Sequence, residues 1–378
     1  MKSASLILVF SVAYASFSLA QQAKVIDPSD IANLKHVSTP EISPDGKLVA
    51  YVVSTPVAAG EHKDAHIWIT STDEAGHAHP FVMSAGTDTD PRWSPDGESI
   101  AFLSDRKNPL GEPGRALFHF SLTGVEGRTD LEPHDDKKDG SDPGMQLWLI
   151  SLHGGEAFPL TNIAGGIKEF RWSKDRKYIA FVRKDQDTAQ ERERKKQKND
   201  EIVVNQNYKY DRLWIYDVAQ HQARLLTKTD INIDAFDWSP EGSEIVARVS
   251  PTPRIDDYWR ISKIVILSAS TGLVEKTIEE HAGYNQPRWS PDGRRVAFSR
   301  TTAKQITDEH IIYSLDDNKT ILLENFFSGT VEQMEWLPDS KSLLAQATVQ
   351  AHTVVLTIDA ASGKSSELEG VTTSAGEI

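Results

Sequence analysis

The sequence predicts an all-β fold, a β-propeller of four-stranded antiparallel blades, and three observations support this prediction. A motif of the Trp-Ser-Pro-Asp-Gly type recurs six times along the 378 residues. Eight of the nine tryptophans occupy two fixed slots of the repeat. The apolar segments are short and separated by turn residues, which favours strands over amphipathic helices. Four such strands in a repeat of about forty-five residues are typical of a propeller blade.

The recurring motif predicts a tight hairpin between the first two strands of each blade. Its six copies are Pro40–Gly46, Pro91–Gly97, Phe170–Arg176, Phe236–Gly242, Pro287–Gly293 and Met334–Ser340. Ser, Pro and Gly stand where a type I turn prefers them. The first tryptophan slot, which ends the incoming strand, holds Trp93, Trp172, Trp238, Trp289 and Trp336.

The remaining strands follow each motif in a regular order. The second strands include Val49–Tyr51, Ile100–Phe102, Ile179–Phe181 and Val296–Phe298. Third strands at His66–Ile69, Leu147–Ile150 and Leu213–Tyr216 carry the second tryptophan slot. Fourth strands are expected at Phe81–Met83, Phe158–Thr161, Leu225–Thr227, Val274–Ile278, Thr320–Leu323 and Ser366–Leu368. Trp259 alone belongs to neither slot.

The beginning of the chain has the pattern of a secretory signal peptide over residues 1–20. Lys2 precedes the apolar run that begins at Leu6, and Ser18–Ala20 offers a cleavage site of small residues. We therefore expect a secreted or periplasmic protein, with a lead-in segment at 21–38 and the six-repeat propeller at 39–371. Residues 372–378 then begin a further blade or form a tail.

Two long insertions separate the second and third strands of two repeats. They cover residues 105–145 and 185–211, so both should emerge from one rim of the propeller. The charge run at 191–198 alternates in sign, which is typical of a solvated helix or loop. Long insertions in compact folds tend to be functional or disordered, so we expect this rim to screen a substrate or dock a neighbouring domain.

Composition excludes several classes of function. The chain has no cysteine, which excludes disulfides, thiolate metal sites and a cysteine nucleophile. Its net charge of −14 argues against a nucleic-acid partner, because such binding needs a basic surface. After signal cleavage no segment is apolar enough to span a membrane.

Four groups of residues resemble binding sites, but each departs from the pattern that such a site requires. His62, His66, His77 and His79 with Asp64 resemble a metal cluster, and His134–Gln146 resembles a calcium loop. Ser362–Ser365 resembles the end of a phosphate loop, and Glu279–Glu280 resembles an amine-binding pair. The histidines lie in strands close to turns, where such side chains are usually solvated, and Lys137 stands where the calcium loop needs a ligand. Ile358 stands where the phosphate loop needs a glycine, and the two glutamates follow the end of a strand. We therefore predict no catalytic, cofactor-binding or metal-binding residue and no cofactor.

The blades resemble the propeller repeat of TolB and of the amino-terminal domain of prolyl oligopeptidase-type serine peptidases. The lead-in Asp27–Leu34 and the stretches Asn199–Val204 and Tyr210–Trp214 are similar to the acylaminoacyl peptidase and dipeptidyl peptidase branch. The resemblance covers residues 24–378. It implies a ring of seven or eight blades followed by an α/β-hydrolase domain, so six blades are expected to form an incomplete ring.

The leading hypothesis is the propeller portion of a secreted serine peptidase that admits short peptides. No G-x-S-x-G nucleophile motif occurs, so the Ser, Asp and His of the family have no counterpart here. The peptide substrate would be cleaved by a hydrolase domain absent from this chain, and an oligomer is possible. Two alternatives remain open: a free-standing TolB-like scaffold for protein binding, and a metal-dependent lyase that would need histidines converging at one mouth of the ring.

Overall fold

A computed structural model describes residues 27, 30, 33–56, 64–73, 76–107, 144–163, 165–198, 206–302, 308–323, 329–349, 352–368 and 373–374. Almost all of the regular structure in these ranges is β-strand. No helix within them is long and apolar enough to cross a membrane. The predicted signal peptide at 1–20 lies outside the described residues.

Six four-stranded antiparallel sheets follow one another along the chain, and we call them blades 1 to 6. Blade 1 contains β1 (His36–Ile42), β2 (Leu48–Thr55), β3 (Asp64–Ser71) and β4 (His79–Val82). Blade 2 contains β5 (Asp88–Trp93), β6 (Ser99–Ser104), β7 (Gln146–Ser151) and β8 (Phe158–Pro159). Blade 3 contains β9 (Glu169–Trp172), β10 (Tyr178–Lys184), β11 (Asp211–Asp217) and β12 (Gln222–Leu225).

The second half of the chain repeats this order. Blade 4 contains β13 (Asn232–Trp238), β14 (Glu244–Ser250), β15 (Lys263–Ser268) and β16 (Val274–Glu279). Blade 5 contains β17 (Arg288–Trp289), β18 (Arg295–Thr301), β19 (Asp308–Ser314) and β20 (Thr320–Leu322). Blade 6 contains β21 (Gly329–Trp336), β22 (Ser342–Val349), β23 (His352–Asp359) and β24 (Ser365–Glu367), and β25 (Thr373–Ser374) also pairs with β23.

Each predicted hairpin turn is present between the first and second strands. In all six repeats the fourth turn residue donates its backbone N–H to the carbonyl of the first, as Gly97 does to Ser94 at 2.8 Å. The fourth residue has a positive φ, which glycine adopts without strain. Arg176 and Ser340 take this left-handed conformation in blades 3 and 6, with φ of 63° and 57°.

The ends of several fourth strands and one short helix differ from the sequence prediction. The fourth strand of blade 3 ends at Leu225 rather than continuing to Thr227, because the N–H groups of Leu226 and Thr227 both turn back to the carbonyl of Leu213. Trp259 lies in a short helix, α3 (Ile255–Arg260), which the strand pattern did not predict. The two long insertions do separate second and third strands, and the second carries helix α2 (Ala189–Lys196).

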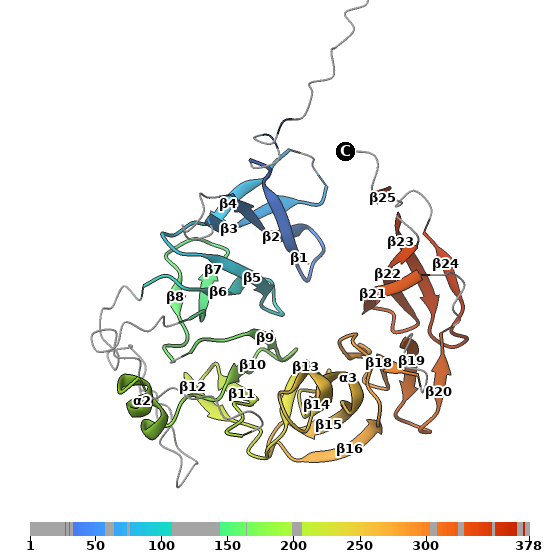
Figure 1. Cartoon of the computed structure of the whole chain (residues 1–378). Coiled ribbons are helices and arrows are strands. Elements are labelled where there is room, and N and C mark those ends of the chain that lie inside the picture. Colours follow the sequence, from blue (N-terminus) through green and yellow to red (C-terminus); the bar gives the residue numbers. More distant parts are fainter. Residues whose placement is uncertain are drawn as a thin grey trace, which may run out of the picture.

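The blades are arranged around an axis, and the arc is open between blade 1 and blade 6 (Figure 1). Five clusters of buried hydrophobic residues each join two consecutive blades. In the described residues no such cluster joins blade 6 to blade 1. The structure is therefore an incomplete ring, as the sequence predicted.

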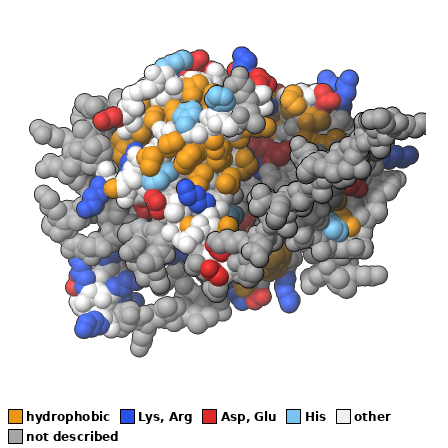
Figure 2. Space-filling model, turned by 90° about the horizontal axis from the view of Figure 1, so that it is seen from above, with side chains coloured by type: hydrophobic (Ala, Val, Ile, Leu, Met, Phe, Trp, Pro, Cys, Tyr) orange, Lys and Arg blue, Asp and Glu red, His pale blue; other side chains and the backbone are white. Residues whose placement is uncertain are grey.

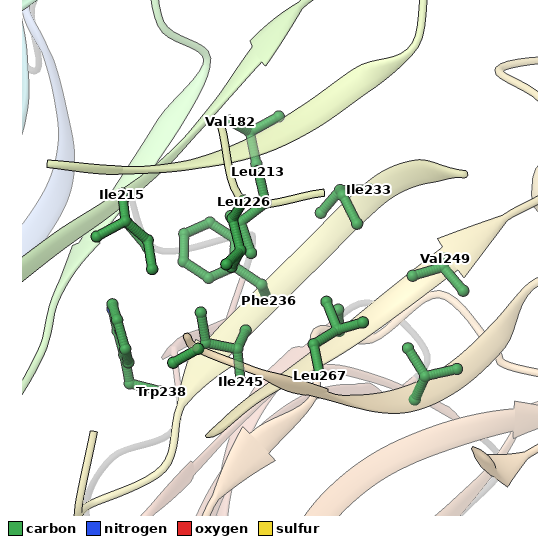
Figure 3. Packing of buried hydrophobic residues seen from close by; sticks show 14 residues of the cluster. Val182, Leu213, Ile215, Leu226, Ile233, Phe236, Trp238, Ile245, Val249 and Leu267 are labelled. Atoms are coloured by element: carbon green, nitrogen blue, oxygen red, sulfur yellow. The ribbon is translucent and has the colours of Figure 1, made fainter. Parts of the chain in front are cut away.

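Each interface between blades packs large side chains of one blade against smaller side chains of the preceding blade. In blade 2, Phe102 and Trp93 pack toward blade 1, where they meet Ala50 and Val52. The next face of blade 2 presents Ala101 and joins the cluster shared with blade 3. The cluster between blades 3 and 4 shows the same arrangement, with Phe236 and Trp238 of blade 4 against the aliphatic side chains of blade 3 (Figure 3).

Tryptophans of the first slot also link blades by hydrogen bonds. Trp93, Trp238 and Trp336 donate their indole N–H to a backbone carbonyl of the preceding blade, at 3.0, 3.1 and 3.0 Å. The indole nitrogens of Trp172 and Trp289 are buried and have no partner among the described residues. An indole hydrogen bond therefore links blades 1 and 2, 3 and 4, and 5 and 6. Among the described residues, the interfaces of blades 2 and 3 and of blades 4 and 5 have no such bond.

Blade 1 has Ile42 in place of this tryptophan, and in the described part of the chain no other blade covers the Ile42 side chain. The Ile42 side chain is 63% exposed, whereas Trp93 in the same slot is 5% exposed. Figure 2 views the side of the molecule on which blade 1 lies and shows hydrophobic side chains gathered there, with histidines among them.

Candidate functional site: a ring of charged side chains at the axis

The innermost strand of every blade carries a charged residue directly before the tryptophan slot. These six residues, which we call the axial ring, are Glu41, Arg92, Arg171, Asp237, Arg288 and Glu335. Successive side chains of a strand point to opposite faces. The tryptophan face packs on the preceding blade, so the charged residue lies on the opposite face of the strand. Because these strands are the innermost strands of their blades (Figure 1), the six residues lie near the propeller axis.

Carboxylates neutralise two of the three arginines of the axial ring. Arg92 donates to Glu41 of blade 1 at 3.0 Å and pairs with Asp90 at 2.9 Å. Arg288 donates to Glu335 of blade 6 at 2.8 Å. The pairs of Arg92 with Glu41 and of Arg288 with Glu335 join neighbouring blades, and hydrogen bonds between charged groups are stronger than those between neutral ones.

The third arginine reaches a blade that is not its neighbour. Arg171 on β9 donates to the side-chain amide oxygen of Gln286 at 2.9 Å, and the two residues are 115 positions apart. Gln286 precedes β17, so this contact joins blade 3 to blade 5. The same oxygen accepts a hydrogen bond from Arg288 at 2.8 Å. Side chains therefore meet across the axis.

Burial shifts the pKa values of several of these groups. It raises the pKa of Glu41, although the charges of Arg92 and Arg171 partly offset this effect. Burial likewise raises the pKa of Glu169, the residue two positions before Arg171. One carboxyl oxygen of Glu169, Oε1, is buried without a hydrogen-bond partner in the described part of the chain. Burial and the charge of Arg288 lower the pKa of Arg171.

This arrangement is suited to binding and orienting charged groups. Guanidinium and carboxylate groups hold a charged ligand through directional hydrogen bonds. None of the six residues of the axial ring is a hydroxyl or thiol nucleophile.

The structure separates the histidines that were weighed as a metal cluster. His66 lies between Asp64 and Asp88, at 2.7 and 3.2 Å, and these carboxylates occupy both ring nitrogens. His79 begins β4 and is exposed, and its ring Nδ1 lies 3.2 Å from the carbonyl oxygen of His77. The described residues contain no group of three or more side chains placed to hold a metal ion. His62 and most of His134–Gln146 lie outside the described residues.

The other weighed groups have ordinary structural roles. Glu280 pairs with Lys263 at 2.6 Å, and Glu279 lies 3.9 Å from Arg300. Ser362 belongs to the hairpin between β23 and β24, where its hydroxyl bonds to Asp359. The charge run at 191–198 begins in helix α2, whose first turn is capped by Thr188.

The sequence analysis did not identify the axial ring as a site. The available signal was the charged residue before the tryptophan slot, which is present in all six repeats. Strand alternation places that residue on the face opposite the tryptophan, but it does not indicate which of the six side chains meet.

Comparison with known proteins connects this fold to peptidases. No protein-family model matches the chain. An uncharacterized peptidase of Bacillus subtilis, YuxL, is 25% identical over 294 residues, covering 77% of this chain and 34% of its own length. Dipeptidyl-peptidase 5 of Porphyromonas gingivalis is 24% identical over 376 residues, covering 90% of this chain and 48% of its own. The chain thus spans less than half the length of either relative.

Solved structures agree on the fold. Acylaminoacyl peptidase of Pyrococcus horikoshii matches with a TM-score of 0.58 at 18% identity, over 89% of this chain and 46% of that one. The β-propeller domain of the Trilobed protease of Pyrococcus furiosus matches with a TM-score of 0.53 at 16% identity, over 91% and 86%. The chain is thus similar in sequence to parts of two peptidases, and it shares the β-propeller fold with these solved structures.

Proposed function

We propose that this chain is the substrate-gating propeller of a secreted serine peptidase that acts on short peptides. The peptidase relatives supply the class of reaction, and more than half of each relative's length lies outside the match, which leaves room for a catalytic domain. In that arrangement the propeller admits substrate, and a Ser-His-Asp centre elsewhere performs acyl transfer. The alternative of a free-standing binding scaffold has no comparable support.

The observation that carries the proposal is the contact across the axis. Arg171 of blade 3 and Arg288 of blade 5 both bind Gln286, and Arg92 binds Glu41 between blades 2 and 1. These contacts place side chains in the space near the axis. Such side chains would obstruct a folded protein more than a short or unstructured chain, so a catalytic centre beyond them would receive mainly short peptides.

The first test is the complete reading frame that encodes this chain. We expect an α/β-hydrolase sequence with a G-x-S-x-G motif downstream of codon 378, and a mature protein that begins at Gln21 in the periplasm or medium. A frame that ends without a hydrolase sequence, or a mature protein that retains residues 1–20 in the cytoplasm, would contradict the proposal.

The second test widens the axis in the full-length product. The double substitution Arg171→Ala with Gln286→Ala should raise the cleavage rate of peptides of about twenty residues relative to that of a dipeptide substrate. Arg224→Ala is the matched control, because Arg224 lies on the outer strand β12 and binds the carbonyls of Ala269 and Ser270. Wild-type enzyme that cleaves folded proteins as fast as short peptides would refute gating by the propeller.

A further inference from the structure

Arg171 differs from the two other arginines of the axial ring in its partners. Arg92 and Arg288 each bind at least one carboxylate directly. Arg171 binds a neutral amide oxygen, that of Gln286. In the part of the chain that the structure describes, no carboxylate lies within ion-pair distance of its guanidinium. Arg171 therefore lacks the direct counter-ion that its two counterparts have.

Two guanidinium groups converge on one neutral acceptor. The Oε1 atom of Gln286 accepts hydrogen bonds from Arg171 at 2.9 Å and from Arg288 at 2.8 Å. Arg288 is paired with Glu335, whereas Arg171 has only this amide oxygen, which carries a partial negative charge. Burial and then the charge of Arg288 lower the pKa of Arg171, and the charges of Asp237 and Glu169 oppose this shift. An anion beside Arg171 would supply the direct counter-ion that it lacks.

Asp237 and Glu169 act on the charge of Arg171, but among the described residues neither lies within ion-pair distance of it. Asp237 is engaged elsewhere, since its Oδ2 accepts the backbone N–H of Trp289 at 2.9 Å. Glu169 precedes Arg171 by two residues, yet its buried Oε1 has no partner in the described structure. Gln286 is exposed and Arg171 is partly exposed, so a small ligand entering along the axis can reach both.

We propose that Arg171 and Arg288 form a binding site for a carboxylate group of a peptide ligand at the propeller axis. A planar guanidinium presents paired N–H donors that match the two oxygens of a carboxylate. The carboxylate is either the carboxyl terminus of a short peptide or an Asp or Glu side chain. The identity of the ligand as a peptide rests on the proposed function, whereas the anion site rests on the two arginines alone.

The test is a binding titration on the purified chain, followed by tryptophan fluorescence. Trp172 and Trp289 directly follow Arg171 and Arg288, so a ligand at the site should change their emission. The probes are Ala-Ala with a free carboxyl terminus, its carboxyl-terminal amide, and acetylated Asp amide. We expect Ala-Ala to bind about tenfold or more tightly than its amide, because charge-assisted hydrogen bonds are lost with the carboxylate. Binding of acetylated Asp amide as well would assign acidic side chains as a second source.

Variants separate a site from a general effect on the fold. Arg171→Gln should weaken Ala-Ala binding about tenfold or more, and Arg171→Lys should recover part of the loss, since it keeps the charge without the paired donors. Glu169→Gln should strengthen binding severalfold, because it removes a competing negative charge. Arg224→Gln is the control, since Arg224 lies on the outer strand β12 and binds the carbonyls of Ala269 and Ser270.

The proposal is overturned if Ala-Ala and its amide bind equally, or if Arg171→Gln and Arg224→Gln have the same effect. It is also overturned if no probe binds while the full-length product hydrolyses peptides, in which case the proposed function stands without this site. Binding that depends on Arg171 in a protein whose reading frame contains no hydrolase would support the site and reject the peptidase function.

Discussion

Blades 1 and 3 use nearly the same strand sequence in different surroundings. Val49–Tyr51 in β2 and Ile179–Phe181 in β10 occupy the same place in the repeat. In β10 both faces of the strand are buried, because blades 2 and 4 cover them. In β2 only the face toward blade 2 is buried, and Tyr51 on the other face is half-buried. The strand sequence thus specifies a blade, whereas the neighbouring blades determine how much of the strand's side-chain surface is buried.

At the other end of the arc, the uncovered face of blade 6 is the face that points away from blade 5. Its second strand, β22, buries Leu343, Ala345 and Ala347 toward blade 5 and leaves Gln346 exposed on the other side. Blade 1 therefore ends the arc with an apolar face and blade 6 with a more polar one. Apolar surface gains about 25 cal/mol per Å² on burial, so covering the free face of blade 1 would yield more free energy per unit area.

The largest expected effect comes from the aromatic residue of the second strand. Phe181→Ala should lower the free energy of unfolding by about 3–5 kcal/mol, because the Phe181 side chain is fully buried between blades 2 and 3. Tyr51→Ala, the same slot in blade 1, should cost less than about 1.5 kcal/mol because that face is uncovered. Urea denaturation of both variants measures the difference. Equal losses would mean that blade 1 is covered in solution.

The tryptophan hydrogen bond gives a second comparison. Trp238→Phe removes an indole N–H that binds a carbonyl of blade 3, and it leaves that carbonyl without its partner. Trp172→Phe removes an N–H that has no partner among the described residues. Since both changes lose similar volume, Trp238→Phe should destabilise by about 1 kcal/mol more. If Trp172→Phe proves equally costly, its indole N–H must bind an ordered water.

The smallest effect concerns the left-handed turn residue. Arg176→Gly should stabilise blade 3 by about 0.5–1 kcal/mol, because a residue with a side chain pays for a positive φ and glycine does not. Gly97→Ala in the corresponding turn of blade 2 should destabilise by about 1 kcal/mol. Thermal unfolding followed by circular dichroism measures both shifts. A loss of stability in Arg176→Gly would show that the ion pair of Arg176 with Asp96 contributes more than the strain.

Much of the fold could be predicted because the tryptophan slots set the register of every repeat. Trp68, Trp148 and Trp214 lie in third strands, and the five tryptophans of the first slot end innermost strands, as expected. Helix α3 was not predicted, because one turn of helix around Trp259 has too few residues for a periodic pattern.

The axial ring could be predicted only in part. The charged residue before each tryptophan is visible in the sequence, and strand alternation places it opposite the packed face. The contact of Arg171 with Gln286 depends on how blade 3 is placed relative to blade 5, two blades further along. No local pattern carries that information, because it results from the summed rotations of the intervening blades.

The pairing of a large face with a small face also has a consequence for how such a chain changes in evolution. A blade inside the arc receives an aromatic layer on one face and contributes one from the other, as blade 2 does through Ala101 and Phe102. Duplicating one blade within the arc therefore creates a junction that already fits on both sides. Gene segments can be gained or lost in whole repeats without any interface having to be redesigned.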